Sequence, residues 1–263
     1  MLVAERYEKI VQLVDEKGSI RVSELSEIFG VTEETVRRDL DNLEKEGRLR
    51  RSHGGAVSVK DKQSEIPYFE REIKNVDEKQ KIAQEAVHHI QENDRIILDA
   101  SSTAWYMAKA LPDIPLTVLT NSIKVAMELS HKAKIEVIST GGSLSKKSLS
   151  YIGPLAERSL DLYHVDKTFV SCQGVHIERG ISESNELQAR LKQKMIELAD
   201  QVILLADYSK FGVQSFTQVT DWTHIDTLIT DARTKQEDLQ ALEELRVQTQ
   251  RLKGSSEDSS VSS

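Results

Sequence analysis

The sequence predicts an α/β protein with two domains, a small helical one at the N-terminus and a larger one built around a parallel-rich sheet. Within residues 1–47, three short segments carry apolar residues at helical spacing. From residue 77 onward, helical patterns alternate with short apolar strands, which is typical of a parallel sheet covered by helices. The 263 residues, 38% of them hydrophobic, are enough for each domain to bury its own core.

The first domain begins with two predicted helices that end at glycines. Apolar residues from Tyr7 to Val14 recur at i, i+3, i+4 and i+7, and Gly18 closes this helix. The stretch "VSELSEIFG" predicts a second helix of about eight residues, with Ser23 as its N-cap and Gly30 after its end.

A third helix and a hairpin complete this domain. Thr32 is placed to cap the helix, which carries two glutamates in its first turn and runs to Gly47. The following "RLRRSHGGAVSV" alternates basic and apolar residues around a glycine turn, so it predicts a two-stranded hairpin. Three short helices followed by such a hairpin indicate a winged helix-turn-helix over residues 1–57.

Two arginine pairs in this domain contrast with the net charge of the whole chain, which is −8. Residues 1–60 are nearly neutral, with 11 basic and 12 acidic residues, so the acidic excess belongs to the second domain. Residues 48–60 include four basic side chains and no acidic one. Positive charge is therefore concentrated in the predicted hairpin, where it can face a polyanion such as DNA.

The third helix resembles a recognition helix in the way its side chains are arranged. If the apolar residues between Val36 and Leu43 are buried, Arg38 faces outward and could form a bidentate contact with guanine, whereas Arg37 at the flank suits a phosphate. Glu33 and Glu34 either stabilise the helix start or accept a bond from cytosine, and both roles stay open. The expected DNA-binding residues are Thr32, Thr35, Arg37, Arg38, Arg50, Arg51, His53, Gly54 and Gly55.

Residues 58–76 are polar, include Pro67 and show no sustained period, so they predict a connector. The second domain is expected over residues 77–247, with strands at "RIILDA", "LTVLT", "IEVIST", "VDKTFVSC", "QVILLA" and "IDTLIT". Residues 248–263 end in "KGSSEDSSVSS" and predict a disordered tail.

One strand end in the second domain is a candidate phosphate site. The stretch "LDASSTAWYMAKAL" places Asp99 at the end of a strand, with Ser101, Ser102 and Thr103 at the start of a helix. Free amides and the dipole of a helix start favour an anion, and the hydroxyls add donors. An ordinary serine helix cap is the structural alternative.

Other strand ends offer further polar groups, because ligands gather at the carboxyl ends of strands in open α/β sheets. Asp207 and Lys210 supply an acid and a cation that could hold a sugar hydroxyl and a phosphate, or form a structural link. The remaining candidates are Thr120, Asn121, Gly141 and Gly142.

The composition argues against several other classes of protein. Cys172 is the single cysteine, so no internal disulfide can form and a reducing compartment, the cytoplasm, is expected. No spacing of cysteines and histidines matches a metal site, and the sequence predicts no cofactor. No apolar run approaches the roughly 18 residues of a membrane span.

The sequence also resembles a known family. The stretch "VSELSEIFGVTEETVRRDLDNLEKEGRLRRSHGGAV" closely resembles the winged helix-turn-helix of DeoR-type bacterial regulators of sugar operons, and the similarity continues through nearly the whole chain. The resemblance implies an N-terminal module that binds operator DNA and a C-terminal domain that senses a phosphorylated sugar. This chain has Ser101 where DeoR-type sensors usually carry glycine, and the serine hydroxyl could compensate for a less close approach of the backbone.

The stretch "LLADYSKFG" is similar both to DeoR sensors and to pentose phosphate isomerases, which share the sheet arrangement. An isomerase needs a carboxylate to move a proton, but the loop where that enzyme group carries its acids reads "SCQGVH" here. Glu183 and Glu186 lie further on, and Glu186, which resembles an acidic helix position of both groups, is a candidate effector-binding residue. An isomerase-like enzyme is therefore the alternative, and a regulator is the prediction.

Together these observations predict a cytoplasmic repressor of a carbohydrate-utilisation operon. Its expected partners are double-stranded operator DNA and a phosphorylated sugar. It is expected to act as a homo-oligomer, a dimer or a tetramer, because two-fold pairing of such modules matches symmetric operator half-sites.

Overall fold

The chain folds into two units, residues 1–64 and 65–263, and the computed structural model describes residues 3–17, 19–52, 54–58 and 65–253. The first unit contains helices α1 (Val3–Lys17), α2 (Val22–Phe29) and α3 (Glu33–Lys45). Ile10, Leu25 and Leu40, one from each helix, are fully buried in a shared core. The predicted amphipathic pattern is confirmed for these helices.

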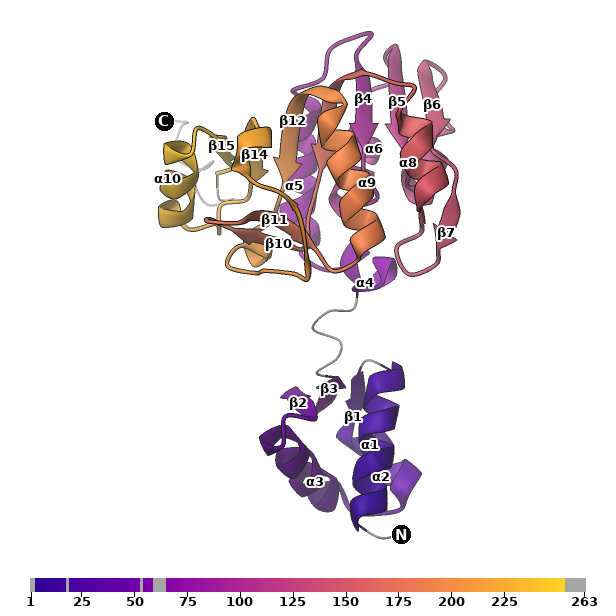
Figure 1. Cartoon of the computed structure of the whole chain (residues 1–263), viewed down its shortest axis with the longest axis vertical. Helices are drawn as coiled ribbons and strands as arrows, with labels where there is room; N and C mark the ends of the chain where they lie inside the picture. Colours follow the sequence, from indigo (N-terminus) through magenta and orange to yellow (C-terminus); the bar gives the residue numbers. More distant parts are fainter. Residues whose placement is uncertain (1–2, 18, 53, 59–64, 254–263) are drawn as a thin grey trace, which may run out of the picture. The chain divides into compact units, whose positions relative to one another are not determined.

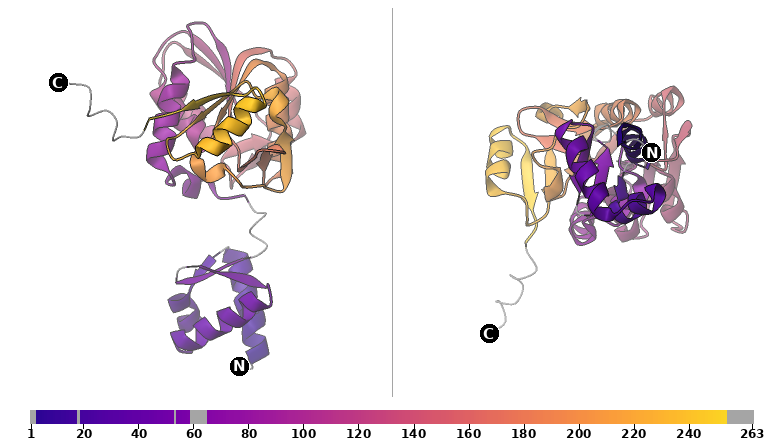
Figure 2. Two further views of the ribbon diagram at one scale, coloured as in Figure 1. Left: turned by 90° about the vertical axis from the view of Figure 1, so that its left-hand side faces the viewer. Right: turned by 90° about the horizontal axis from the view of Figure 1, so that it is seen from below.

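A small antiparallel sheet packs against the three helices (Figure 2). The predicted hairpin consists of β2 (Leu49–Ser52) and β3 (Gly55–Ser58), and a third strand that the sequence did not predict, β1 (Ser19–Arg21), pairs with β3. The Thr32 side chain accepts a hydrogen bond from the amide of Thr35, which confirms the predicted cap of α3. The predicted cap of α2 is wrong, because this helix already begins at Val22.

The second unit is a three-layer α/β structure around a seven-stranded sheet with the order β15-β14-β12-β9-β4-β5-β6 (Figure 1). All neighbouring strands in it are parallel, as predicted. The strands of this sheet are β4 (Arg95–Leu98), β5 (Leu116–Thr120), β6 (Ile135–Ser139), β9 (Val165–Val170), β12 (Ala199–Leu205), β14 (Thr227–Thr230) and β15 (Gln248–Arg251). The shorter strands are β7 (Ser143–Ser145), β8 (Ser150–Ile152), β10 (Gly174–His176), β11 (Gly180–Glu183) and β13 (Thr217–Thr220).

Helices cover both faces of the sheet because its strands are apolar on both sides. The helices are α4 (Tyr68–Glu72), α5 (Val76–Val87), α6 (Ser102–Ala110), α7 (Ile123–Leu129), α8 (Pro154–Leu160), α9 (Glu186–Glu197) and α10 (Gln236–Glu244), with short 3-10 turns at Tyr208–Lys210 and Trp222–His224. In β4, Ile96 and Leu98 pack with α5, α6 and α7, whereas Ile97 between them packs with α8 and α9 on the opposite face. None of the helices in the described ranges is long and apolar enough to cross a membrane.

Two predicted boundaries differ from the structure. Residues 58–76 were expected to be a connector, but α4 lies within them, and its Tyr68 is fully buried against the second unit. The predicted tail began at residue 248, but Gln248–Arg251 pairs with β14 at the edge of the sheet. Neither segment shows an apolar period, because α4 buries one large aromatic side chain and is otherwise held by polar contacts, and β15 is held by backbone hydrogen bonds.

Candidate functional site

The exposed side of α3 carries one arginine that is free and one that is paired. Arg37 contacts Glu33 at 2.6 Å and Glu34 at 3.7 Å. Arg38 is exposed, and its side chain forms no ion pair or hydrogen bond with any residue of the described ranges. The two acids therefore neutralise Arg37, while the guanidinium of Arg38 keeps all its donors.

The inner side of α3 is fixed by a buried ion pair. The Asp39 carboxylate accepts hydrogen bonds from Arg6 of α1 at 2.6 Å and 3.2 Å, and both residues are buried. The start of the helix is ordered by Thr32 and Thr35, whose hydroxyls lie 2.9 Å apart. Asp39 therefore sets how α3 sits on α1, and with it the direction in which Arg38 points.

The hairpin offers fewer free groups than the sequence suggested. Arg51 is bound to α3, because its guanidinium contacts Asp41 at 2.5 Å and its amide donates to Glu44. Gly55 is buried, and a Cβ there would lie 2.2 Å from the carbonyl oxygen of Ile20 in β1, so packing explains this glycine.

The other hairpin candidates are only partly described. Gly54 is exposed with a φ of 83°, so it suits a tight turn that leaves the backbone accessible. Arg50 lies in β2, whereas its side chain and the whole of His53 lie outside the described part of the chain. Direct contact of these residues with DNA stays a prediction.

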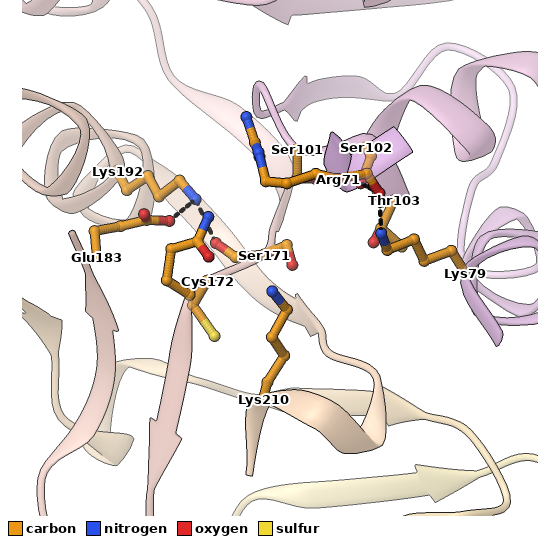
Figure 3. Close-up of a pocket in the computed structure, with 11 residues that line it drawn as sticks. Arg71, Lys79, Ser101, Ser102, Thr103, Ser171, Cys172, Glu183, Lys192 and Lys210 are labelled. Carbon is orange, nitrogen blue, oxygen red and sulfur yellow. Dashed lines mark hydrogen bonds and ion pairs between the residues drawn. The ribbon is translucent and has the colours of Figure 1, made fainter. Parts of the chain in front are cut away.

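A second candidate site lies in the second unit at the carboxyl ends of β4 and β9. The chain runs from β4 outward through β5 to β6, and then from β9 outward in the opposite direction to β15. Strand order therefore reverses between β4 and β9, and open α/β sheets bind ligands in the crevice at such a point. A pocket at this edge is lined by Arg71, Lys79, Ser101, Ser102, Thr103, Ser171, Cys172, Gln173, Glu183, Lys192 and Lys210 (Figure 3).

Lys192 of α9 holds one side of this pocket together. Its ammonium lies 3.0 Å from Asp99 and 2.5 Å from Glu183, and it also donates to the carbonyl oxygen of Ser171 at 2.5 Å. All three charged residues are buried. Burial would lower the pKa of Lys192, but the two carboxylates outweigh burial and raise it, so the lysine stays charged.

The start of α6 forms another wall of the pocket. The Ser101 hydroxyl caps the helix by accepting from the amide of Ala104, and the Ser101 amide donates to Asp99. This leaves the amides of Ser102 and Thr103 without an acceptor inside the helix. The predicted serine cap and the predicted anion-binding helix start are therefore compatible, since one hydroxyl caps and two further residues line the pocket.

Three more cations line the pocket and lack a carboxylate partner. Within the described ranges, Arg71, Lys79 and Lys210 form no ion pair at all. Lys79 is almost completely buried and donates to the carbonyl oxygens of Arg71 and Lys74, and burial lowers its pKa to about 8. The empty space among the lining residues, including its opening to solvent, is about 280 Å³, so the three cations border a recess that is open to solvent.

Several predicted effector-binding residues do not line this pocket. Asp207 is buried, and its carboxylate accepts hydrogen bonds from the side-chain amide of Asn75 and from the backbone amide and hydroxyl of Ser209. Its contacts therefore favour the structural role over contact with the effector. Glu186 is exposed at the start of α9, whereas Glu183, three residues earlier, faces the pocket. The structure thus favours Glu183 over Glu186 as the pocket acid.

The predicted residues at the carboxyl ends of β5 and β6 also have structural roles. The Thr120 hydroxyl accepts from the backbone amide of Ser122, and the side-chain amide of Asn121 donates to the carbonyl oxygen of Tyr151. Gly142 has a φ of 115°, and a Cβ there would lie 3.0 Å from the side chain of Ala156, while Gly141 has a φ of 61°. These four residues lie one or two strands away from the reversal point, which explains why they do not line the pocket.

Sequence reasoning missed Arg71, Lys79 and Lys192 as site residues. Arg71 fell within the predicted connector, and the two lysines lie on amphipathic helices, where a lysine normally indicates the solvent face. Cys172 lines the pocket but is buried, and burial raises the pKa of its thiol to about 12, in keeping with its predicted role as a small buried residue.

Comparison with known proteins identifies both units. Residues 6–62 match the model of the DeoR-like helix-turn-helix domain, and residues 74–232 match the model of the DeoR C-terminal sensor domain. The chain is 60% identical to an uncharacterized HTH-type transcriptional regulator, YulB, of Bacillus subtilis, over 94% of this chain and 96% of the relative.

The names of two further relatives state whether the protein activates or represses transcription. The L-fucose operon activator of Haemophilus influenzae is 42% identical over 86% of this chain and 91% of its own length. The HTH-type transcriptional repressor GlcR of Bacillus subtilis is 38% identical over 88% of this chain and 89% of its own length. Because the matched domains and these relatives are regulators, the isomerase alternative is set aside, and the chain belongs to the DeoR family of DNA-binding transcriptional regulators.

Proposed function

We propose that this regulator binds a phosphorylated sugar in the pocket between β4 and β9, and that this effector controls its binding to operator DNA. One observation carries the proposal: Arg71, Lys79 and Lys210 line one pocket and have no carboxylate within ion-pair distance in the described ranges. Holding Arg71 and Lys210 near the buried amine of Lys79 without a counter-charge costs free energy, and a bound anion removes that cost. A phosphate dianion supplies the missing negative charge.

The pocket offers different groups to the two parts of such a ligand. The three cations and the start of α6 suit the phosphate, because helix starts and arginine forks both bind phosphate oxygens. Glu183 and Gln173, on the side held by Lys192, offer acceptors for sugar hydroxyls. The pocket thus combines a cationic end with a hydrogen-bonding end.

We further propose that the protein acts as a cytoplasmic repressor and as a homo-oligomer, a dimer or a tetramer. One relative is named a repressor and another an activator, so the direction of regulation is a property of the individual protein. A strain that lacks the gene should transcribe the regulated operon at a higher level without the sugar. Lower transcription in that strain would instead identify an activator.

A panel of phosphorylated sugars is expected to contain at least one that stabilises the sensor unit against heat. A ligand at about 100 times its Kd adds about 2.7 kcal/mol, which is a rise in Tm of about 5 to 10 °C for a unit of this size. The measurement is a thermal-shift scan with each sugar phosphate and with the matching unphosphorylated sugar. Stabilisation by the unphosphorylated sugars alone would contradict the proposal.

The Lys210→Ala variant tests whether the shift arises in this pocket. Loss of one charge-assisted contact of about 1.5–3 kcal/mol should weaken binding about tenfold to hundredfold, so at the same ligand concentration the thermal shift should fall to about half or less. Lys235→Ala is the matched control, because Lys235 is exposed and pairs with Glu237 away from the pocket. Equal shifts in both variants would place the ligand elsewhere.

Affinity for an anion is expected to fall as the pH rises above about 8. Burial lowers the pKa of Lys79 to about 8, Lys210, Arg71 and Lys74 act in the same direction, and Asp207 opposes the shift. A bound phosphate favours the charged amine, so binding takes up a proton once Lys79 is neutral. The affinity should then fall by up to about tenfold per pH unit above that pKa.

Calorimetric titration with inorganic phosphate at about pH 8 and about pH 9.5 measures this effect, because phosphate is mostly the dianion throughout that range while Lys79 loses its charge. The Lys79→Met variant should bind weakly at both values and lose most of the pH dependence. A wild-type affinity that stays constant across the range would show that Lys79 does not meet the anion.

A further inference from the structure

The segment that leads from the DNA-binding unit into the sensor unit supplies part of the effector pocket. Residues 65–75 are the first described residues of the second unit, and Glu65 and Arg71 from this segment line adjoining parts of the pocket. Both side chains also lie beside Lys192 and Glu183. A ligand in the pocket therefore meets the chain just after the DNA-binding unit ends.

Arg71 is placed to bind an anion with most of its donors. Its Nε donates to the carbonyl oxygen of Ile66 at 3.1 Å, and its guanidinium carbon lies 5.4 Å from the centre of the Tyr68 ring. Both partners belong to the same short segment, so they fix the guanidinium without pairing its charge. Figure 3 shows the Arg71 side chain reaching across the pocket on the side of Ser101 and Ser102.

Two other pocket residues hold the backbone of this segment. Lys79 donates to the carbonyl oxygens of Arg71 and Lys74 at 2.5 Å and 2.7 Å, and Ser102 donates to the carbonyl oxygen of Arg71 at 3.3 Å. The two residues line the pocket as well, so they contact both the site of the anion and the backbone of α4. An anion in the pocket therefore meets groups that also hold this backbone, and Lys79 has a third N–H donor to offer it.

Within the described part of the chain, α4 also has contacts with residues outside the pocket. The hydroxyl of Tyr106 donates to the carbonyl oxygen of Glu72, and Lys124 pairs with the Glu72 carboxylate at 3.1 Å. The amide of Tyr68 donates to the carbonyl oxygen of Lys147. These contacts attach α4 to the unit independently of the pocket residues.

We infer that Arg71 is an effector-binding residue, and that phosphate binding through it changes the order of residues 65–75, the segment that continues into the DNA-binding unit. This inference rests on the proposed function, and it identifies residues 65–75 as the segment that responds when the pocket is occupied. In this arrangement no further residues are needed between the bound effector and the segment 65–75. The anion bonds directly to a side chain of the segment whose backbone Lys79 and Ser102 already hold.

Amide hydrogen exchange of the full-length protein, with and without saturating inorganic phosphate, tests the inference. Phosphate should slow exchange in peptides that cover residues 66–75, because the arginine fork ties the segment to the bound anion. The Arg71→Ala variant should bind phosphate about tenfold to hundredfold more weakly and lose this protection. Arg71→Lys, which keeps the charge but not the fork, should fall between the two.

The matched control is Arg158→Ala, since the Arg158 side chain likewise donates through Nε to a carbonyl oxygen of its own segment but lies outside the pocket. It should behave like the wild type in both measurements. Phosphate binding with wild-type affinity in Arg71→Ala, or binding by the wild type without protection of residues 66–75, would overturn the inference and leave the proposed function standing. Absence of phosphate binding to the wild-type pocket would overturn both.

Discussion

Replacing Lys192 with methionine is expected to lower the free energy of unfolding of the sensor unit by about 3–5 kcal/mol. The lysine ammonium lies between the buried carboxylates of Asp99 and Glu183, and its removal leaves two negative charges without a cation in the interior. The cost arises mainly from these uncompensated charges. For a unit of this size the Tm should fall by about 6 to 20 °C.

A neighbouring lysine on the same helix provides the control. Lys194 pairs with Asp161 at the surface, and the Lys194→Met variant should lose at most about 1 kcal/mol, because exposed ion pairs contribute little. Thermal unfolding of both variants measures the difference. A second check is the combined variant Asp99→Asn, Glu183→Gln and Lys192→Met, which should recover part of the lost stability. Equal stability of the two single variants would contradict the role assigned to the buried ion pairs.

The parts of the fold that the sequence predicts well are those with a regular apolar pattern. The helical spacing of Tyr7 to Val14 and the apolar runs of β4, β5, β12 and β14 each follow from burial of one face or of both faces of an element. Thr32 could be identified as a cap because a threonine before two glutamates is a local signal. These features depend only on neighbours in the sequence.

The parts that escaped prediction depend on distant partners. β1 has only three residues and exists because β3 pairs with it, so no local period identifies it. In the same way, α4 is held by Tyr68 and by contacts from α5, α6 and α7, which a polar stretch with a proline does not reveal. Such elements are defined by the rest of the fold.

The candidate site shows the same division. Ser101 to Thr103 and Lys210 could be predicted, because they follow strands at the edge of the sheet where ligands bind. Lys79 and Lys192 could not, since a buried lysine has the same sequence pattern as an exposed one until its partners are known. The family resemblance favours Glu186, but Glu183, at the end of β11, is the acid that lines the pocket.

Replacing Arg38 with alanine is expected to reduce the affinity for operator DNA about tenfold to hundredfold, because a bidentate arginine contact with guanine contributes about 1–3 kcal/mol. Arg38 is exposed on α3 and has no partner among the described residues, so its donors are available to a base. Gel retardation of the DNA upstream of the regulated operon, with unrelated DNA as competitor, measures the loss. The preference for that DNA over the competitor should fall with the affinity.

The Arg37→Ala variant is the matched control for Arg38→Ala, because both remove an arginine from the same helix. Glu33 and Glu34 already neutralise its guanidinium, so Arg37→Ala should weaken binding less than Arg38→Ala and leave sequence preference intact. If Arg37 binds a phosphate, its removal should also lower the slope of log affinity against log salt by about one. A larger loss of sequence preference in Arg37→Ala than in Arg38→Ala would reverse the two roles, and equal binding by the Arg38 variant and the wild type would remove Arg38 from the interface. Consecutive residues on a helix lie about 100° apart, so Arg37 and Arg38 point in different directions. The Arg6–Asp39 hydrogen bonds fix the rotation of α3 on α1, and the two variants therefore test two distinct directions on one rigid helix.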